Sequence, residues 1–162
     1  MMNEQDLTLR FGEGIVNLRA GAIILKNGKI LMTGNTGVDY LYSVGGRIRF
    51  GESAEEAVKR EVWEETGVQM SVDRLGFIHE CYFLDKDPGP TKGKLFYEIS
   101  FYFYMKVPEN FEPVCDSITR GGAREYLEWI SPEDPRTYYR EFLREELKNP
   151  CREIRHILSD ER

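Results

Sequence analysis

Residues 46–68 read GRIRFGESAEEAVKREVWEETGV, and the second half of this stretch predicts a helix over residues 53–66. Ser53, followed three residues later by Glu56, forms a capping box, in which each side chain accepts a hydrogen bond from the backbone N–H of the other residue. Gly67 stands where the helix should end, because glycine readily adopts the left-handed conformation of a helix C-cap. The sequence therefore fixes both ends of this helix.

Three acidic residues of this helix, Glu61, Glu64 and Glu65, stand at positions i, i+3 and i+4. This spacing places their carboxylates on one stripe of the helix surface, where they repel one another. A bound cation would offset that repulsion, and ligands that are all oxygen favour a hard ion such as Mg²⁺, with Mn²⁺ also possible. A Glu-rich helix is more often only a solvated face, so the stripe alone does not establish a metal site.

The loop before the helix begins with Gly45 and Gly46. Paired glycines let the backbone approach a ligand closely, and a backbone carbonyl of Gly46 can then join the carboxylates as a ligand. Arg60 can hold the carboxylates in position through charge-assisted hydrogen bonds. Taken singly, a Gly-Gly pair is usually a turn and an Arg beside a Glu is usually a surface pair.

Together these residues fall into a fixed pattern: Gly46, five residues, Glu52, seven residues, and then REVWEETGV over residues 60–68. The pattern resembles the Nudix box of the Nudix hydrolase family at every defining position. The resemblance implies an α+β fold, an α/β/α sandwich with a central mixed β-sheet. It also implies Mg²⁺-dependent hydrolysis of a pyrophosphate bond in a nucleoside diphosphate linked to another group X. Val44 stands where many members carry Pro, which weakens the expectation of a rigid loop but leaves the metal site intact.

The resemblance also assigns roles to individual residues. The metal ligands would be Glu61, Glu64, Glu65 and the backbone of Gly46. Arg60 would orient the carboxylates and Glu52 would brace the loop against the helix. In this scheme metal ions neutralise the phosphate oxygens and activate a water molecule, and a carboxylate takes the proton of that water.

The general base has two candidates, Glu64 in the box and Glu98 in a strand predicted over residues 96–105. In that strand the odd positions form an apolar face of Tyr97, Ile99, Phe101, Phe103 and Met105. Glu98 and Ser100 share the opposite face with Tyr102 and Tyr104, which could line a groove. The resemblance adds that members often place an auxiliary acid on a strand after the box. An exposed strand glutamate without function is an equally good interpretation of Glu98.

Further side chains are candidates for substrate binding. Arg47 and Arg49 could contact phosphate oxygens, although we expect at least one of them to be only a solvated surface residue. Tyr42 could stack on a nucleobase, but aromatic residues beside strands more often belong to a core. The two histidines, His79 and His156, lack partners that would mark a ligand or a base, and we expect Arg19 to be a structural member of an ion pair.

The flanking sequence predicts the remaining elements of an α+β fold. Two apolar runs, 20–25 and 29–32, flank an Asn27-Gly28 turn, which is typical of a hairpin. We expect extended segments at 40–44, 77–84, 96–105 and 125–130, a loop at 86–94, a helix at 135–148 and either a strand or a helical turn at 153–158. The whole of residues 1–162 fits one domain.

Bulk composition narrows the class of protein. Apolar residues make up 41% of the 162 residues and the net charge is −6, so no bulk nucleic-acid binding is expected. Cys81, Cys115 and Cys151 are too few and too widely separated for a zinc motif, and we expect free thiols. No apolar run suggests a signal segment or a membrane span, so we expect a cytoplasmic protein that acts on a small nucleotide derivative. A flat aromatic strand would permit a homodimer.

Two other functions compete with a hydrolase. A Nudix-fold binding or regulatory module without catalysis would be expected to have a damaged box, whereas every glutamate of the box is present here. A Nudix-fold isomerase acting on an isoprenoid diphosphate would need a catalytic cysteine facing the metal, and Cys81 is the only plausible residue.

Overall fold

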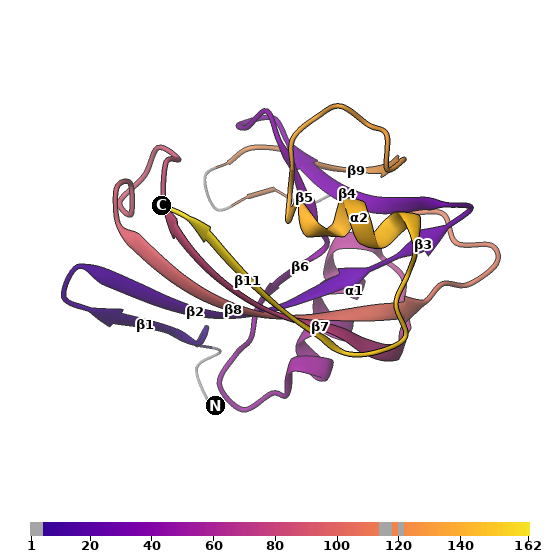
Figure 1. Cartoon of the computed structure of the whole chain (residues 1–162), viewed down its shortest axis with the longest axis horizontal. Coiled ribbons are helices and arrows are strands. Elements are labelled where there is room, and N and C mark those ends of the chain that lie inside the picture. The colour runs from indigo at the N-terminus through magenta and orange to yellow at the C-terminus, as the bar shows by residue number, and fades with distance from the viewer. Residues whose placement is uncertain (1–4, 114–117, 120–121) are drawn as a thin grey trace.

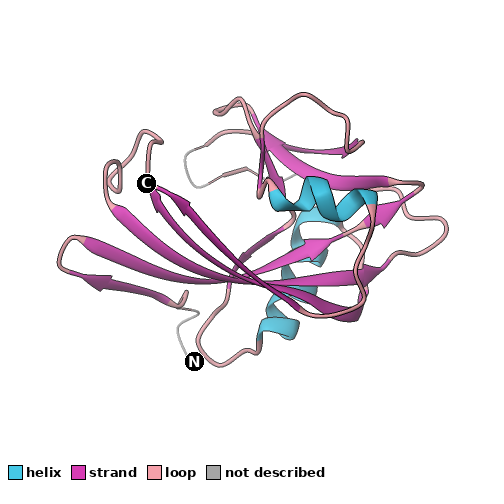
Figure 2. Ribbon diagram, viewed as in Figure 1, coloured by secondary structure: helices cyan, strands magenta, loops and turns pink. Residues whose placement is uncertain are grey.

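The strands form two mixed sheets in the computed structural model, which describes residues 5–113, 118–119 and 122–162 (Figure 1). One sheet has the order β1-β2-β8-β7-β11 with β6 also paired to β2, and the other has the order β10-β5-β4-β3 with β9 also paired to β4. The strands are β1 (Thr8–Phe11), β2 (Gly14–Ile23), β3 (Leu25–Lys26), β4 (Lys29–Asn35), β5 (Leu41–Ser43), β6 (Gly45–Arg47), β7 (Ser71–Leu84), β8 (Leu95–Lys106), β9 (Glu125–Ile130), β10 (Tyr138–Tyr139) and β11 (Arg155–Glu161). The helices are α1 (Ala54–Thr66) and the shorter α2 (Phe142–Lys148) (Figure 2).

The predicted Asn27-Gly28 turn is confirmed. Both residues have a left-handed backbone, with φ of 52° and 71°, as a two-residue turn between twisted strands requires. The apolar run before the turn does not stay in one sheet, however. It pairs with β8 up to Ile23 and then, from Leu25, with β4, so the chain passes from the first sheet into the second at Ile24.

The molecule has two hydrophobic cores, and successive side chains of β8 pack alternately into one and the other. Phe103 and Met105 of β8 pack in the same cluster as α1, whereas Tyr102 and Tyr104 pack in the cluster that includes α2. Because successive side chains of a strand point to opposite faces, the sheets are covered by α1 on one face and α2 on the other. The expected α+β class with an α/β/α arrangement is therefore confirmed, with the strands divided between two sheets.

The first half of β8 departs from the expected pattern of burial. Glu98 and Ser100 are buried, whereas Tyr97, Ile99 and Phe101 on the predicted apolar face are only half-buried. The face of β8 that was predicted to line a groove is therefore buried at Glu98 and Ser100.

Helix α1 has the caps that the sequence predicts. The Ser53 hydroxyl accepts from the Glu56 N–H at 3.2 Å, and the Glu56 carboxylate accepts from the Ser53 N–H at 2.8 Å. Gly67 ends the helix with φ of 72°, and its N–H donates to the carbonyl of Trp63. One face of α1 is buried through Ala57, Val58 and Val62. The acidic stripe adjoins this buried face, because Glu61 and Glu65 are half-buried against the strands and Glu64 is exposed.

The predicted helix over 135–148 is wrong in its first half, because α2 begins only at Phe142. Tyr138 and Tyr139 instead form β10, which pairs in parallel with Leu41 and Tyr42 of β5. Tyr138 is fully buried in the second core, so packing and strand pairing override the helical spacing of the apolar residues. For residues 153–158 the sequence allowed either a strand or a helical turn. The structure has a strand there, because β11 pairs in parallel with β7.

Cys81 and Cys151 are free thiols, as expected, while Cys115 lies outside the described residues. Within the part of the chain that the structure describes, neither helix is long and apolar enough to cross a bilayer.

Helix α2 is joined to the first sheet through Glu146, a buried carboxylate. It accepts hydrogen bonds from the Tyr104 hydroxyl, from the Cys151 N–H at 2.7 Å and from Arg155 Nη1 at 3.1 Å. Replacing Glu146 by Ala should lower the free energy of unfolding by about 1–3 kcal/mol, because the buried Tyr104 hydroxyl loses its acceptor. Urea unfolding followed by circular dichroism measures this loss.

The matched control is Glu145→Ala, one position earlier on the exposed side of α2. That variant should stay within about 0.5 kcal/mol of the wild type. Equal losses in the two variants would contradict the role given to Glu146.

A second prediction concerns pH. His79 is fully buried, with Nε2 2.9 Å from the Ser159 hydroxyl, and burial, assisted by Arg140, lowers its pKa from 6.5 to about 4. The unfolded chain therefore binds a proton near pH 6.5 that the folded chain binds only near pH 4, so stability falls as the pH drops through this window. When the pH is lowered from 7 to 4.5, the free energy of unfolding of His79→Gln should therefore fall by about 2 kcal/mol less than that of the wild type.

Urea titrations at several pH values measure this difference. His156→Gln removes the other histidine, which is exposed in a surface pair with Glu80, and is the control for loss of an imidazole that is not buried. Parallel pH profiles for His79→Gln and the wild type would refute the prediction.

Candidate metal and diphosphate site

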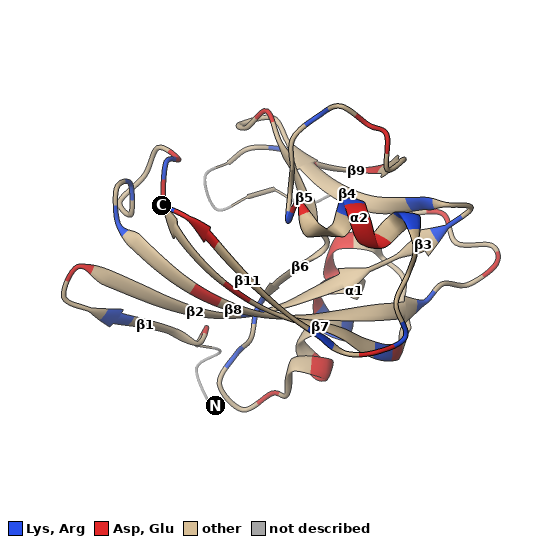
Figure 3. Ribbon diagram, in the orientation of Figure 1, with Lys and Arg blue, Asp and Glu red and all other residues tan. Residues whose placement is uncertain are grey.

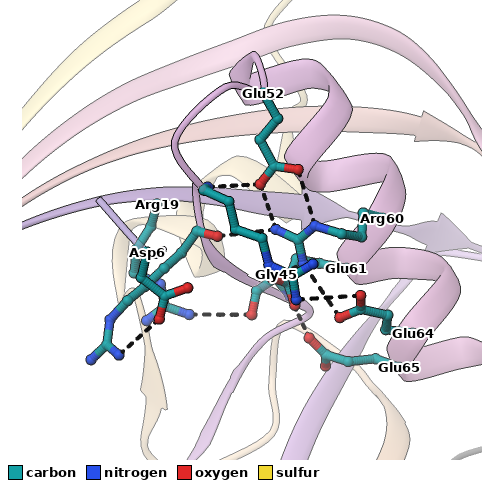
Figure 4. Close-up of polar contacts among 10 residues, drawn as sticks. Asp6, Arg19, Gly45, Glu52, Arg60, Glu61, Glu64 and Glu65 are labelled. Carbon is teal, nitrogen blue, oxygen red and sulfur yellow. Dashed lines mark hydrogen bonds and ion pairs between the residues drawn. The ribbon is translucent and has the colours of Figure 1, made fainter. Parts of the chain in front are cut away.

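Helix α1 packs against β6, so its acidic stripe meets the backbone of two glycines (Figure 4). A Cβ atom on Gly46 would lie 2.5 Å from the Glu61 carboxyl carbon, which means that any larger residue would displace that carboxylate. Gly45 has φ of 142°, and its N–H donates to Glu65 Oε1 at 2.9 Å. The absence of side chains at these two positions lets the carboxylates touch the strand.

Arg60 connects the loop, the strand and the acidic stripe. Its Nε and Nη2 atoms donate to the two oxygens of Glu52 at 3.0 and 2.6 Å, and its Nη1 donates to Glu61 at 2.5 Å and to Glu64 at 3.3 Å. Nη2 also donates to the carbonyl of Arg47 at 3.1 Å. Arg60 therefore makes the contacts expected of a residue that orients the carboxylates.

Glu52 makes the bracing contacts that were expected of it. Besides pairing with Arg60, it accepts from the Arg49 N–H at 2.8 Å and so joins the loop to the helix. Burial opposes its ionisation, but the hydrogen bonds from Arg60 and Arg49 lower its pKa below the usual value.

Burial dominates the electrostatics of two of the acidic residues. It raises the pKa of Glu61 above its usual value, although Arg60 acts in the opposite direction. It raises the pKa of Glu65 to about 8, although the Gly45 N–H and the Thr33 hydroxyl, 2.8 Å away, act against it. Glu64 differs from both, since 41% of its side chain is exposed. The hydrogen-bond partners of Glu61 and Glu65 therefore do not overcome the effect of burial, which favours the protonated form of both carboxyls.

The acidic stripe has the oxygen donors that a hard divalent cation prefers. The three carboxylates have different partners, however. Glu61 accepts a hydrogen bond from Arg60, and Glu64 forms ion pairs with Arg60 and Arg49. Glu65 accepts hydrogen bonds from Gly45 and Thr33. Among the described residues, no three His, Cys, Asp or Glu side chains converge as a ready-made metal site. The ligand assignment from the resemblance therefore stays a prediction, supported by donor chemistry and by the space at Gly46.

The two loop arginines contact different carboxylates. Arg49 Nη2 is 3.6 Å from Glu64, and Arg47 Nη1 is 3.4 Å from Asp6. Arg47 also borders a cavity of about 250 Å³, together with Arg10 and Phe96. Arg49 thus lies beside the acidic stripe, whereas the guanidinium of Arg47 contacts Asp6, outside the stripe.

Tyr42 lies at the other side of the site, in the second sheet. Its hydroxyl accepts from Asn35 Nδ2 at 3.1 Å and donates to Glu125 at 2.9 Å. Its ring meets the ring of Tyr40 edge-on, with centroids 6.3 Å apart. The hydroxyl is engaged within the protein, which leaves ring contacts as its means of binding a substrate.

Glu98 is 3% exposed, so the interpretation of an exposed strand residue is wrong. Arg140 Nη2 donates to it at 2.6 Å, and Arg19 Nη1 lies 3.9 Å away. Burial raises the pKa of Glu98, but the two arginines outweigh burial and bring it below the usual value. Arg19 also donates to the carbonyl of Gly45 at 3.3 Å, so the expected ion-pair residue connects Glu98 to the acidic site.

Two residues of this region were not singled out in the sequence. Thr33 is a polar residue inside the buried run of β4, and its hydroxyl contact with Glu65 joins segments far apart in the chain. Arg140 falls where a helix was predicted, which hid its contact with Glu98. A lone polar residue in a buried strand was the available signal for Thr33, whereas nothing local pointed to Arg140.

Known proteins support the family suggested by the box. The family model described as NUDIX domain matches residues 16–150. A MutT-like protein from Streptomyces ambofaciens is 33% identical over 61 residues, which cover 38% of this chain and 40% of the relative. The matched part is therefore less than half the length of that curated relative.

Solved structures share the fold at low sequence identity. A UDP-X diphosphatase has a TM-score of 0.57 at 17% identity, covering 89% of this chain and 66% of the other. A MutT NUDIX hydrolase from Burkholderia pseudomallei gives 0.56 at 20% identity, covering 84% and 98%. An ADP-ribose pyrophosphatase from Streptococcus suis gives 0.55 at 18% identity, covering 88% and 98%. With a family model that spans most of the sequence and takes in the whole of residues 46–68, this chain belongs to the NUDIX family.

Proposed function

We propose that this protein hydrolyses a pyrophosphate bond in a nucleoside diphosphate linked to another group X, with Mg²⁺ as the cofactor. One observation carries the proposal: Glu61 and Glu65 of α1 lie against the glycine backbone of β6, and Arg60 contacts both Glu61 and Glu64. Such a site supplies oxygen ligands beside a loop that has two further arginines. The names of the solved relatives, a UDP-X diphosphatase and an ADP-ribose pyrophosphatase, support the same substrate class.

In this proposal the ion is held by Glu61, Glu64, Glu65 and the carbonyl of Gly46. Once bound, it would neutralise phosphate oxygens and lower the pKa of a water molecule. Arg60 keeps the carboxylates in place, since it contacts Glu61 and Glu64 directly. Arg47 and Arg49 contact the phosphate oxygens from the loop side, and the ring of Tyr42 contacts the nucleoside or X.

We assign the proton-accepting role to Glu64 in preference to Glu98. Glu64 is the most exposed carboxylate of the stripe, so a substrate and an attacking water can reach it. Glu98 is buried against two arginines that keep its pKa low, and a carboxylate so stabilised is a weak base. Glu98 then serves to hold Arg19 near Gly45.

The geometry disfavours the isomerase alternative. Cys81 is fully buried beside Glu98 in the sheet register, and burial raises the pKa of its thiol to about 12. A thiol of this kind is neither exposed to a substrate nor ionised at neutral pH. A catalytically silent binding module remains the alternative that experiment has to separate from a hydrolase.

A substrate screen tests the proposal. The panel contains ADP-ribose, UDP-sugars, nucleoside triphosphates and dinucleoside polyphosphates, each with Mg²⁺ or with EDTA. Released products are treated with a phosphatase and phosphate is read by a malachite-green assay. At least one class should be hydrolysed with Mg²⁺ and not with EDTA, and Glu64→Gln should reduce that rate by roughly 10²–10⁴-fold while the protein stays folded.

Glu55→Gln is the matched control, because Glu55 is an exposed residue in the first turn of the same helix and pairs only with Lys59. It should keep the wild-type rate. If nucleotides bind but none is cleaved, the protein is a binding module. A near-normal rate for Glu64→Gln would remove Glu64 from the mechanism.

A further inference from the structure

The carboxylate of Glu65 is fixed by donors from two different sheets. Thr33, in β4 of the second sheet, donates its hydroxyl to Glu65 Oε2 at 2.8 Å. Gly45, in β6 of the first sheet, donates its N–H to Glu65 Oε1 at 2.9 Å. Thr33 is fully buried, so neither water nor substrate competes for its hydroxyl.

The direction of these hydrogen bonds is set by chemistry. A carboxylate that binds a cation is ionised and only accepts, so in that form the Thr33 hydroxyl is the donor to Glu65 Oε2. Each oxygen of Glu65 accepts one of these bonds and keeps a second lone pair for another partner. The two donors together determine the rotamer of Glu65 and the direction in which the remaining lone pairs point.

We propose that Thr33 is a positioning residue for the divalent cation: its hydroxyl holds the Glu65 carboxylate in the orientation in which it binds the ion. The inference rests on the proposed function, in which Glu65 is a ligand. Thr33 touches neither the ion nor the substrate. It acts across the interface between the two sheets, so the second sheet contributes to a site otherwise built from α1 and β6.

A purely structural role for the hydroxyl predicts a different result. If Thr33 only satisfies a buried carboxylate, its loss lowers stability and leaves metal affinity unchanged. If it positions a ligand, its loss weakens metal binding by the ~10–100-fold typical of residues that orient ligands. Metal affinity and stability must therefore be measured separately.

The test uses Mn²⁺ as the probe and needs no substrate. Free Mn²⁺ is counted by electron paramagnetic resonance during titration of the wild type, Thr33→Val and Thr33→Ser, and Mg²⁺ is titrated in as competitor. Valine keeps the shape of threonine without the donor, so Thr33→Val should bind ~10–100-fold more weakly. Serine keeps the hydroxyl, so Thr33→Ser should retain wild-type affinity.

Thr66→Val is the matched control. Thr66 is also fully buried and lies next to Glu65, but its hydroxyl donates to the carbonyl of Val62 and not to the carboxylate. Thr66→Val should lose stability without losing affinity for Mn²⁺. Equal weakening in Thr66→Val and Thr33→Val would overturn the inference, because any buried hydroxyl would then have the same effect.

Two further outcomes keep the inference separate from the proposed function. If the wild type binds no Mn²⁺, the proposed metal site itself fails. If the wild type binds Mn²⁺ and Thr33→Val binds equally well, only the role of Thr33 fails. Should Thr33→Val not fold by circular dichroism, Thr33→Ala replaces it, and in a Glu65→Gln background the loss of the hydroxyl should have no further effect on affinity.

Discussion

The guanidinium of Arg60 is the interaction on which the rest of the site depends. It contacts Glu52 at the end of the loop, Glu61 and Glu64 on α1, and a carbonyl of β6. Without this cation the acidic stripe would repel itself and would have no fixed position relative to the strand. Arginine suits this task because its planar guanidinium group offers several N–H donors in a fixed geometry and stays charged when partly buried.

The position of the site follows from the place where the chain changes sheets. Strand β2 pairs with β6 and β8 up to Ile23, and the chain then enters the second sheet at Leu25. Helix α1 lies along this junction, so Glu61 meets β6 while Glu65 reaches β4. Figure 3 marks acidic positions on both helices, yet only those of α1 lie against glycine backbone. The geometry of the candidate site therefore depends on packing between the sheets as well as on the residues of the box.

Local signals in the sequence were enough for the elements whose ends are set by side-chain or turn chemistry. The capping box and Gly67 delimit α1, and the Asn27-Gly28 turn defines the hairpin, because these effects act within a few residues. The same reasoning failed for residues 135–141, where the spacing of apolar residues is helical but strand pairing and burial of Tyr138 decide the conformation.

The site shows the same division between local and distant determinants. Arg60, Glu52 and the acidic stripe lie within one short motif, so their contacts follow from helix geometry and from the preceding loop. The partners of Glu65 and Glu98 come from segments distant in sequence: Thr33 for the former, and Arg19 and Arg140 for the latter. Sheet register brings these residues together, and register cannot be read from one segment alone.

Charge balance explains why this arrangement would suit a divalent ion, as proposed. Arg60 offsets part of the charge of Glu61 and Glu64, whereas the donors to Glu65 among the described residues are the uncharged Thr33 hydroxyl and Gly45 N–H. Burial without an opposite charge disfavours ionisation, which is why the pKa of Glu65 rises to about 8. A nearby divalent ion would favour the ionised form and so remove this cost. An ion that binds only the folded chain also stabilises it by mass action. In the proposed function, metal binding and folding would therefore be thermodynamically linked through the buried carboxylate of Glu65.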